Sequence, residues 1–251
     1  MLPVKRAVIL WVCLAILCTG GCRTASVRLP DAPYTVSFTE VYFPAGTAIQ
    51  VHLAYPTLEG YADTAAAERM HTAALEYANT QFALEGLIAS GDTQYTYSVN
   101  DTALLLATPR FLSVRIGGII TVLPGGNARY FAYTFNYDLS AGTILESQDV
   151  FSDYAAVKDL WKAGRFRQDF GYASLEKEIS WEDMIAQYHE EYGVYPHVYF
   201  TEGRLGLLID TVASLDGYAG FSIDIREVQN HLRTENPTIA FLCGDLAAED
   251  S

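Results

Sequence analysis

Cys22 is the residue whose surroundings point most directly to chemistry. It follows a basic start, an apolar run over residues 7–17 and the small residues Thr19-Gly20-Gly21. The apolar run is about half as long as a membrane-spanning helix, and this order of segments is typical of a cleavable export signal. Cleavage before Cys22 would leave its thiol in the new N-terminal residue, where a diacylglycerol can be attached. We therefore predict a signal peptide over residues 1–21 and lipidation of Cys22.

The segment Thr19-Gly20-Gly21-Cys22 resembles the lipobox of bacterial lipoproteins, with Thr19 where leucine is commonest. The resemblance implies an anchor of several acyl chains, which hold a protein firmly where a single chain binds weakly. Arg23 replaces the aspartate that retains such proteins at the inner membrane of two-membrane bacteria. We expect a place in the cell envelope outside the cytoplasm, at the outer membrane or the outer leaflet of the plasma membrane. The alternative is a plain secretory signal with a chance cysteine.

No other catalytic or metal-binding motif is complete in the sequence. His189 lacks the second histidine of the His-Glu-x-x-His zinc motif, and the Gly-x-Ser-x-Gly elbow and phosphate loop are missing. Cys243 is the one cysteine left after export and lipidation, and its apolar neighbours predict a core residue. Two carboxylates could cleave a sugar, but 30 acidic residues single out no pair. We expect no cofactor, no metal ion and no catalysis.

The expected mature chain is strongly acidic. The full sequence has a formal charge of −14, and loss of residues 1–21 removes two basic residues and no acidic one, which leaves −16. Nucleic acids and anionic lipids bind clusters of Lys and Arg, so we expect no nucleic-acid partner. A basic protein suits this charge better. The alternative is that the acidity serves solubility alone.

Tyrosine is abundant, with 17 residues, and Tyr130, Tyr133 and Tyr137 lie on the expected strand after a glycine turn. A tyrosine ring has an apolar body and a polar tip, which suits contacts with glycans and proteins. The alternative is that tyrosines alternating along a strand only pack against a sheet. The candidate binding residues are Gly125, Gly126, Asn127, Tyr130 and Tyr133.

A sheet must position these residues. Apolar residues two apart predict strands, and His52 falls on the polar face of one of them, where we expect it to be solvated. Gly125-Gly126-Asn127 predicts a tight hairpin turn, and Pro44-Ala45-Gly46 predicts another. The expected strands are 34–39, 41–43, 49–55, 94–99, 103–107, 111–116, 119–123, 129–139, 197–201 and 205–211.

Apolar residues spaced by four and three predict a long amphipathic helix over residues 63–88. We expect it to pack Met70, Ala74, Tyr77 and Leu84 on a sheet that contains Ile49, Val51 and Leu53. Shorter helices are expected near Tyr154–Trp161, after a capping pair at Ser180 and Asp183, and after a second pair at Asp224 and Glu227.

These elements predict an α+β fold, an antiparallel sheet with helices packed on one face. We divide the chain into the signal peptide 1–21, a tether 22–33, an N-terminal α+β subdomain 34–108 and a C-terminal α+β subdomain 109–245.

Three stretches together resemble the extracytoplasmic domain of the RsiV-like family. The first joins Leu112-Ser113-Val114, the Gly-Gly turn at 125–128 and the segment Asn136-Tyr137-Asp138-Leu139-Ser140-Ala141-Gly142; the second is Asp149-Val150-Phe151; and the third runs from Val198 to Val228. The resemblance covers about residues 34–235. It implies a sheet-and-helix domain, and the best understood member of the family is an anti-sigma factor that senses lysozyme by binding it. The family's turn usually reads Gly-Gly-Ala-His-Pro, and this sequence has no histidine there.

Two function classes follow. The first is a non-catalytic lipoprotein of the cell envelope that binds a basic protein such as lysozyme, or peptidoglycan. The second is a cell-wall glycan hydrolase or esterase with an unrecognised site. A serine–histidine contact in a cleft, or a close pair of buried carboxylates, would favour the second, whereas a closed core with no perturbed ionisable group would favour the first.

Overall fold

The computed structural model describes residues 24–27, 34–42, 49–84, 94–123, 125–171, 196–210 and 217–245. The expected turn at 44–46, the capping pair at 180 and 183 and the lipidation site Cys22 lie outside them. The elements, in chain order, are β1 (Thr24–Val27), β2 (Thr35–Tyr42), β3 (Ile49–Glu59), α2 (Thr64–Leu84), β4 (Gln94–Ala107), β5 (Phe111–Leu123), β6 (Asn127–Asp138), β7 (Thr143–Ile144), α3 (Ser147–Val150), α4 (Tyr154–Lys162), β8 (Arg167–Phe170), β9 (His197–Thr201), β10 (Arg204–Asp210), β11 (Tyr218–Asp224), α6 (Ile225–Val228), the 3-10 helix η3 (Gln229–His231) and α7 (Pro237–Asp245).

The strands form two sheets, and the fold is mixed α+β. One sheet has the order β1-β2-β3-β4-β5-β6-β7, and the other has the order β8-β11-β10-β9. β3 pairs with β4 in parallel, so the prediction of a purely antiparallel sheet is wrong. The parallel pair arises because α2 stands between β3 and β4 in the chain, and a helical crossover returns the chain to the end where β3 began.

The chain divides into two compact units, and each is discontinuous in sequence. Unit 1 contains residues 1–104 and 116–130, and unit 2 contains residues 105–115 and 131–251. The sequence predicts one boundary between residues 108 and 109. The long strands β4, β5 and β6 instead each contribute residues to both units, so no single cut in the chain separates them.

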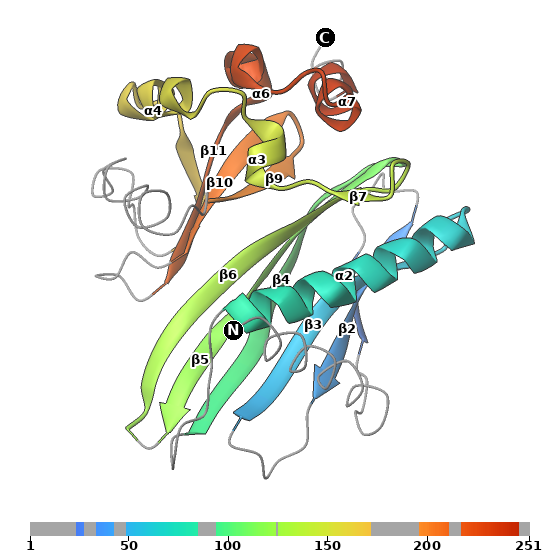
Figure 1. Ribbon diagram of the computed structural model, residues 1–251, viewed down its shortest axis with the longest axis vertical. Helices are drawn as coiled ribbons and strands as arrows, with labels where there is room; N and C mark the ends of the chain where they lie inside the picture. Colours follow the sequence, from blue (N-terminus) through green and yellow to red (C-terminus); the bar gives the residue numbers. More distant parts are fainter. Residues whose placement is uncertain are drawn as a thin grey trace, which may run out of the picture. The chain divides into compact units, whose positions relative to one another are not determined.

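Unit 1 has a core between α2 and its strands. Met70, Ala74 and Tyr77 on α2 are buried, and so are Val51 and Leu53 on β3. α2 lies against β3 (Figure 1), where the His71 and Tyr55 rings stack with their centroids 5.4 Å apart. These five residues are buried, as expected, and the side chains of the other two residues expected there, Leu84 and Ile49, lie outside the described part of the structure.

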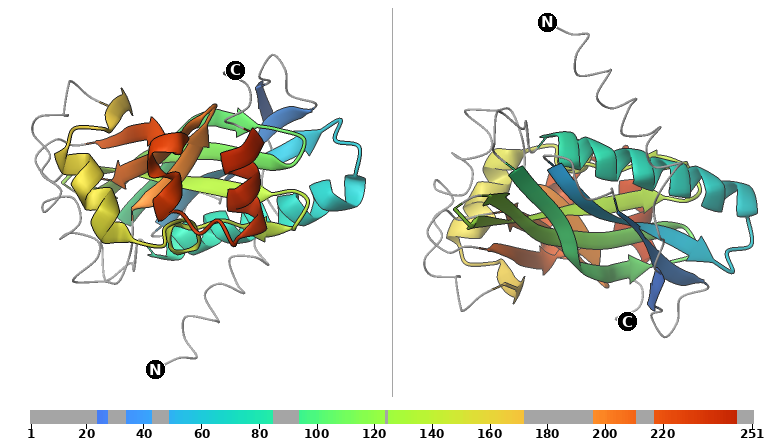
Figure 2. Two further views of the ribbon diagram at one scale, coloured as in Figure 1. Left: turned by 90° about the horizontal axis from the view of Figure 1, so that it is seen from above. Right: turned by 90° about the horizontal axis from the view of Figure 1, so that it is seen from below.

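Unit 2 has a larger apolar core on the four-stranded sheet. Phe221, Leu207 and Phe200 of the sheet share it with Val157 of α4 and Leu242 of α7. Figure 2 shows α4, α6 and α7 over this sheet. The Trp161 ring of α4 contacts Phe221 edge to face, with the centroids 4.9 Å apart.

Close packing in unit 2 depends on a glycine opposite a buried tyrosine. Tyr199 on β9 faces Gly206 on β10 directly across the strand pair. A side-chain carbon at Gly206 would overlap the Tyr199 ring. Glycine is therefore needed at this position for space, and any larger residue would displace the tyrosine.

Asp224 and Cys243 lie where the sequence predicts. Asp224 caps α6 by accepting a hydrogen bond from the Arg226 backbone N–H, as expected, whereas Glu227 pairs with Arg165. Cys243 is half-buried and packs against the core of unit 2, and burial raises the pKa of its thiol. Among the described helices, none combines the length and hydropathy needed to cross a bilayer.

Truncating Leu53 should destabilise unit 1. Its side chain has 0% exposure, so Leu53→Ala should lower the free energy of unfolding by about 2–5 kcal/mol through lost burial and a residual cavity. Urea denaturation followed by circular dichroism measures this. Leu123→Ala is the matched control, because Leu123 is 39% exposed and its truncation should cost less than about 0.5 kcal/mol. Equal costs for both variants would contradict the assigned core.

Candidate functional site

The Gly125-Gly126 turn connects β5 and β6, as the sequence predicts. Gly125 and Gly126 have positive φ angles of 126° and 71° and are exposed, and the Gly126 N–H donates to the Val122 carbonyl oxygen at 3.0 Å. Positive φ is readily adopted only by glycine, which explains the pair of glycines in a tight turn. β6 begins at Asn127, directly after this turn.

The two tyrosines proposed as binding residues differ in exposure. Tyr130 is half-buried on β6. Tyr133 is 2% exposed, so its ring belongs to the interior and is not presented to a partner in this structure. Leu123, which the sequence analysis did not single out, is 39% exposed at the end of β5 and adjoins the turn. We call Leu123, Gly125, Gly126 and Tyr130 the hairpin tip.

Two of the residues considered for chemistry in the sequence cannot be placed. Cys22 and His189 lie outside the described residues. Within the described ranges, no group of three or more His, Cys, Asp or Glu side chains is arranged to hold a metal ion.

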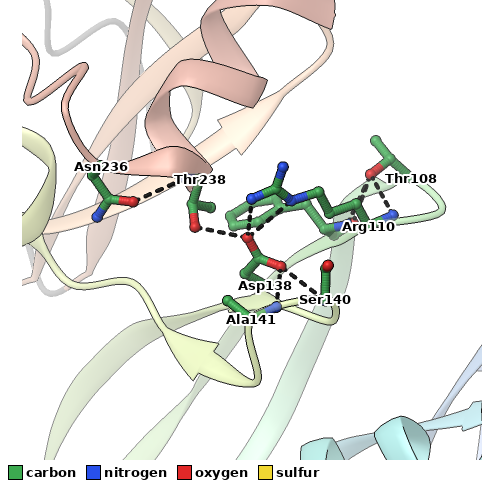
Figure 3. A network of polar contacts seen from close by, with 8 residues as sticks. Thr108, Arg110, Asp138, Ser140, Ala141, Asn236 and Thr238 are labelled. Atoms are coloured by element: carbon green, nitrogen blue, oxygen red, sulfur yellow. Dashed lines mark hydrogen bonds and ion pairs between the residues drawn. The ribbon is translucent and has the colours of Figure 1, made fainter.

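Unit 2 contains a buried carboxylate, Asp138, at the end of β6 (Figure 3). Its Oδ1 accepts hydrogen bonds from the backbone N–H groups of Ser140 and Ala141, both at 2.8 Å. Its Oδ2 accepts from Arg110 Nε and Nη2, at 3.0 and 2.9 Å, and from the Thr238 hydroxyl at 2.7 Å. The carboxylate thus joins three segments that are far apart in sequence.

Local turn chemistry positions these donors. Thr108 accepts hydrogen bonds from the backbone N–H groups of Arg110 and Phe111, which fixes the turn between β4 and β5. Asn236 accepts from the Thr238 N–H at 2.9 Å and stands before Pro237, the first residue of α7. Asparagine is favoured before a helix because its side chain accepts from an unpaired N–H of the first turn, and proline is favoured at the first position because it has no N–H to leave unpaired.

The donors determine the charge of Asp138. Burial alone would raise the pKa of the carboxyl group, but the hydrogen bonds from Arg110, the Ala141 N–H and Thr238 outweigh it and lower the pKa. Arg110 also lies over the Phe241 ring, with its guanidinium carbon 4.8 Å from the centroid. Asp138 is therefore ionised at neutral pH, and both of its oxygens accept hydrogen bonds from the protein itself, which suits a role in stabilising the fold.

A second buried network covers the edge of β9. The Val198 carbonyl oxygen accepts from Thr134 Oγ1 at 2.5 Å and from Asn136 Nδ2 at 2.8 Å. The Phe200 N–H donates to Ser113 Oγ at 3.1 Å, and Ser113 donates to Asn136 Oδ1 at 2.7 Å. An edge strand presents unpaired backbone groups, and these three side chains satisfy two of them.

Sequence reasoning did not identify these polar residues as buried. Thr134, Asn136 and Asp138 alternate with aromatic residues along one strand, and such alternation is typical of a face exposed to water. One signal was present: Asp138 precedes Ser140-Ala141-Gly142, and aspartate commonly accepts hydrogen bonds from the backbone of the following turn.

Neutralising Asp138 should destabilise the protein in a pH-dependent manner. Asp138→Asn removes the charge that Arg110 pairs with and should cost about 2–3 kcal/mol at pH 7, as for hydrogen bonds to a charged group. The folded pKa is lowered, so the wild-type advantage is full above about pH 4 and is lost as the pH falls through the folded value. Urea denaturation at pH 7, 5 and 3 measures this. A difference between wild type and variant that stays constant over this range would contradict the assignment.

No protein-family model and no curated protein matches the chain. Solved structures of DUF3298 family proteins, a bacterial domain of unknown function, are similar to it. A structure from Bacteroides fragilis shares 16% identity over 89% of this chain and 98% of its own, with a TM-score of 0.45. One from Pseudomonas aeruginosa PAO1 shares 12% identity over 86% of this chain and 95% of its own, with a TM-score of 0.44.

Proposed function

We propose that the protein is a lipid-anchored lipoprotein of the bacterial cell envelope whose folded part is an RsiV-like module that binds a protein or a peptidoglycan-related ligand. The anchor rests on the order of segments before Cys22, a basic start, an apolar run and small residues. The lipid would hold the folded units outside the cytoplasm, at a membrane surface.

The observation that carries the binding role is the hairpin tip. A large apolar side chain, Leu123, is exposed directly beside the Gly125-Gly126 turn, and Tyr130 follows on β6 with its ring half-buried. An aliphatic and an aromatic side chain beside a tight turn can anchor a partner by burying apolar area. Tyr133 takes no part in this surface, because its ring is interior.

The partner that we favour is a basic protein such as lysozyme. The expected mature charge of −16 would raise the association rate with any basic protein, over a range of about 8 Å at physiological ionic strength. Charge alone gives no specificity. The hairpin tip would supply it, because an apolar contact survives salt that screens the long-range attraction.

Removal of the lipidation site should release the protein from membranes. Cys22→Ser cannot accept the diacylglycerol, so the variant should lose labelling by a fatty-acid analogue and move to the soluble fraction. Cell fractionation with immunoblotting measures this, and Cys243→Ser is the matched control that should remain attached. Persistence of Cys22→Ser in membranes after a high-salt wash would refute the lipid anchor.

Titration calorimetry against two basic proteins separates specific from non-specific binding. Lysozyme should bind at physiological salt, whereas cytochrome c should bind only at low salt. Leu123→Asp should weaken lysozyme binding about tenfold or more by placing a charge at an apolar contact. Thr72→Asp adds the same charge on an exposed site of α2 and should leave the affinity nearly unchanged.

Equal binding of both proteins that disappears with salt would mean non-specific attraction. Absence of lysozyme binding at both salt concentrations would exclude lysozyme as the ligand. An unchanged affinity in Leu123→Asp would exclude the hairpin tip as the contact surface.

A further inference from the structure

Three neighbouring strands of unit 1 bring a serine, a histidine and a carboxylate into one row. His52 on β3 lies directly opposite Ser98 on β4, in the parallel pair. On its other side, β2 pairs antiparallel with β3 and places Tyr42 opposite His52 and Glu40 opposite Ala54. Side chains two apart on a strand share a face, so Glu40, Tyr42, His52 and Ser98 occupy the same side of the sheet.

The side chains are in contact in the order Ser98, His52, Glu40. Ser98 Oγ lies 3.3 Å from His52 Nδ1, and His52 Nε2 lies 3.6 Å from Glu40 Oε2. The first distance is within hydrogen-bond range, and the second is just beyond it, so the Glu40 carboxylate acts on the imidazole mainly through its charge. Serine, histidine and carboxylate in this order are the components of a nucleophilic triad, and such contacts are often looser in a protein without its substrate.

Tyr42 contacts both His52 and Glu40. Its ring stacks on the His52 imidazole with the centroids 4.1 Å apart and the planes 5° apart. Its hydroxyl donates to Glu40 Oε2 at 2.8 Å. One residue thus fixes the plane of the imidazole and the position of the carboxylate that faces it.

The carboxylate selects the tautomer that catalysis needs. An ionised glutamate only accepts hydrogen bonds, so Glu40 favours the neutral imidazole that carries its proton on Nε2. Nδ1 is then left with its lone pair toward Ser98 and accepts the hydroxyl proton. Burial lowers the pKa of His52, against the opposing effect of Glu40, so the imidazole is neutral at pH 7. The sequence prediction that His52 is solvated is therefore wrong, since its side chain is only 17% exposed and contacts Ser98, Glu40 and Tyr42.

We infer that Ser98, His52 and Glu40 form a nucleophilic site that hydrolyses small acyl esters. Ser98 Oγ attacks the ester carbonyl carbon and forms a new C–O bond, while its proton passes to His52 Nδ1. The bond between the carbonyl carbon and the alcohol oxygen then breaks, and the departing oxygen takes the proton from His52. Water hydrolyses the acyl-serine by the same proton path and releases the carboxylic acid.

Glu40 and Tyr42 act as positioning residues in this site. Glu40 stabilises the imidazolium that forms when Nδ1 takes the proton, because its Oε2 faces Nε2. Tyr42 keeps Glu40 in place. The activity is additional to the binding role and departs from the expectation of a non-catalytic module, and its residues are separate from the hairpin tip.

A fluorophosphonate probe tests the nucleophile directly. The probe reacts with activated serines, and mass spectrometry of the labelled full-length protein should locate the adduct on Ser98. Labelling should disappear in Ser98→Ala and fall about 10²–10⁴-fold in rate in His52→Gln, as for loss of a general base. Ser140→Ala, at an exposed serine of unit 2, should label normally. Absence of a Ser98 adduct on folded wild-type protein overturns the proposal without recourse to any variant.

Hydrolysis of para-nitrophenyl acetate tests the roles of the other residues. The wild-type kcat/KM should rise with pH as His52 loses its proton, with a midpoint below 6.5, because the His52 pKa is lowered from that value. Glu40→Gln should reduce kcat more than it raises KM. Tyr42→Phe keeps the stacked ring, loses the hydroxyl and should have a smaller effect than Glu40→Gln. A flat pH profile, or equal rates in wild type and Ser98→Ala, contradicts the site.

Discussion

A fully buried carboxylate must find its hydrogen-bond donors inside the protein, and this constraint organises unit 2. Asp138 has 0% exposure and meets it with Arg110, Thr238 and two backbone N–H groups of the following turn. The backbone donors follow Asp138 directly in the sequence, whereas Arg110 and Thr238 come from distant segments, so the buried carboxylate is fully paired only when all three segments are in position. Loss of one partner would leave an uncompensated buried charge, which is far more costly than the pair itself is stabilising. The same logic holds for the edge of β9, which Thr134, Asn136 and Ser113 cover.

Turn residues and the spacing of apolar residues predicted most helices and strands. The pairing of strands far apart in the sequence could not be predicted from them. The hairpin at Gly125-Gly126 and the helix now seen as Thr64–Leu84 follow from turn chemistry and from apolar spacing, both of which act within a few residues. The parallel pairing of β3 and β4 does not follow from either strand, because alternation is the same in parallel and antiparallel partners. The sequence predicted two subdomains, but it could not show that each unit is discontinuous, since β4, β5 and β6 contribute residues to both.

The same holds for the candidate sites: residues of one turn could be identified from the sequence, whereas residues brought together from several strands could not. The turn residues Gly125 and Gly126 were identifiable, because positive φ and exposure are properties of the turn itself. The burial of Tyr133 could not be predicted, because alternation does not reveal which face of a strand is covered. The row of Ser98, His52 and Glu40 comes from three strands, so it required the strand order and register. A serine and a histidine 46 residues apart carry no sequence signal of their contact.

The central structural claim is that Asp138 couples the β4–β5 turn to α7 through Arg110 and Thr238. A double-mutant cycle with Arg110→Met and Thr238→Val measures this coupling directly, with free energies of unfolding for both single variants and the double variant. Residues in one hydrogen-bond network show coupling energies of about 0.5–3 kcal/mol, whereas independent sites add to within about 0.3–0.5 kcal/mol. We expect a coupling above about 0.5 kcal/mol at pH 7 that decreases at low pH, where Asp138 becomes protonated. Additive costs at both pH values would contradict the claim that one buried carboxylate joins the two segments.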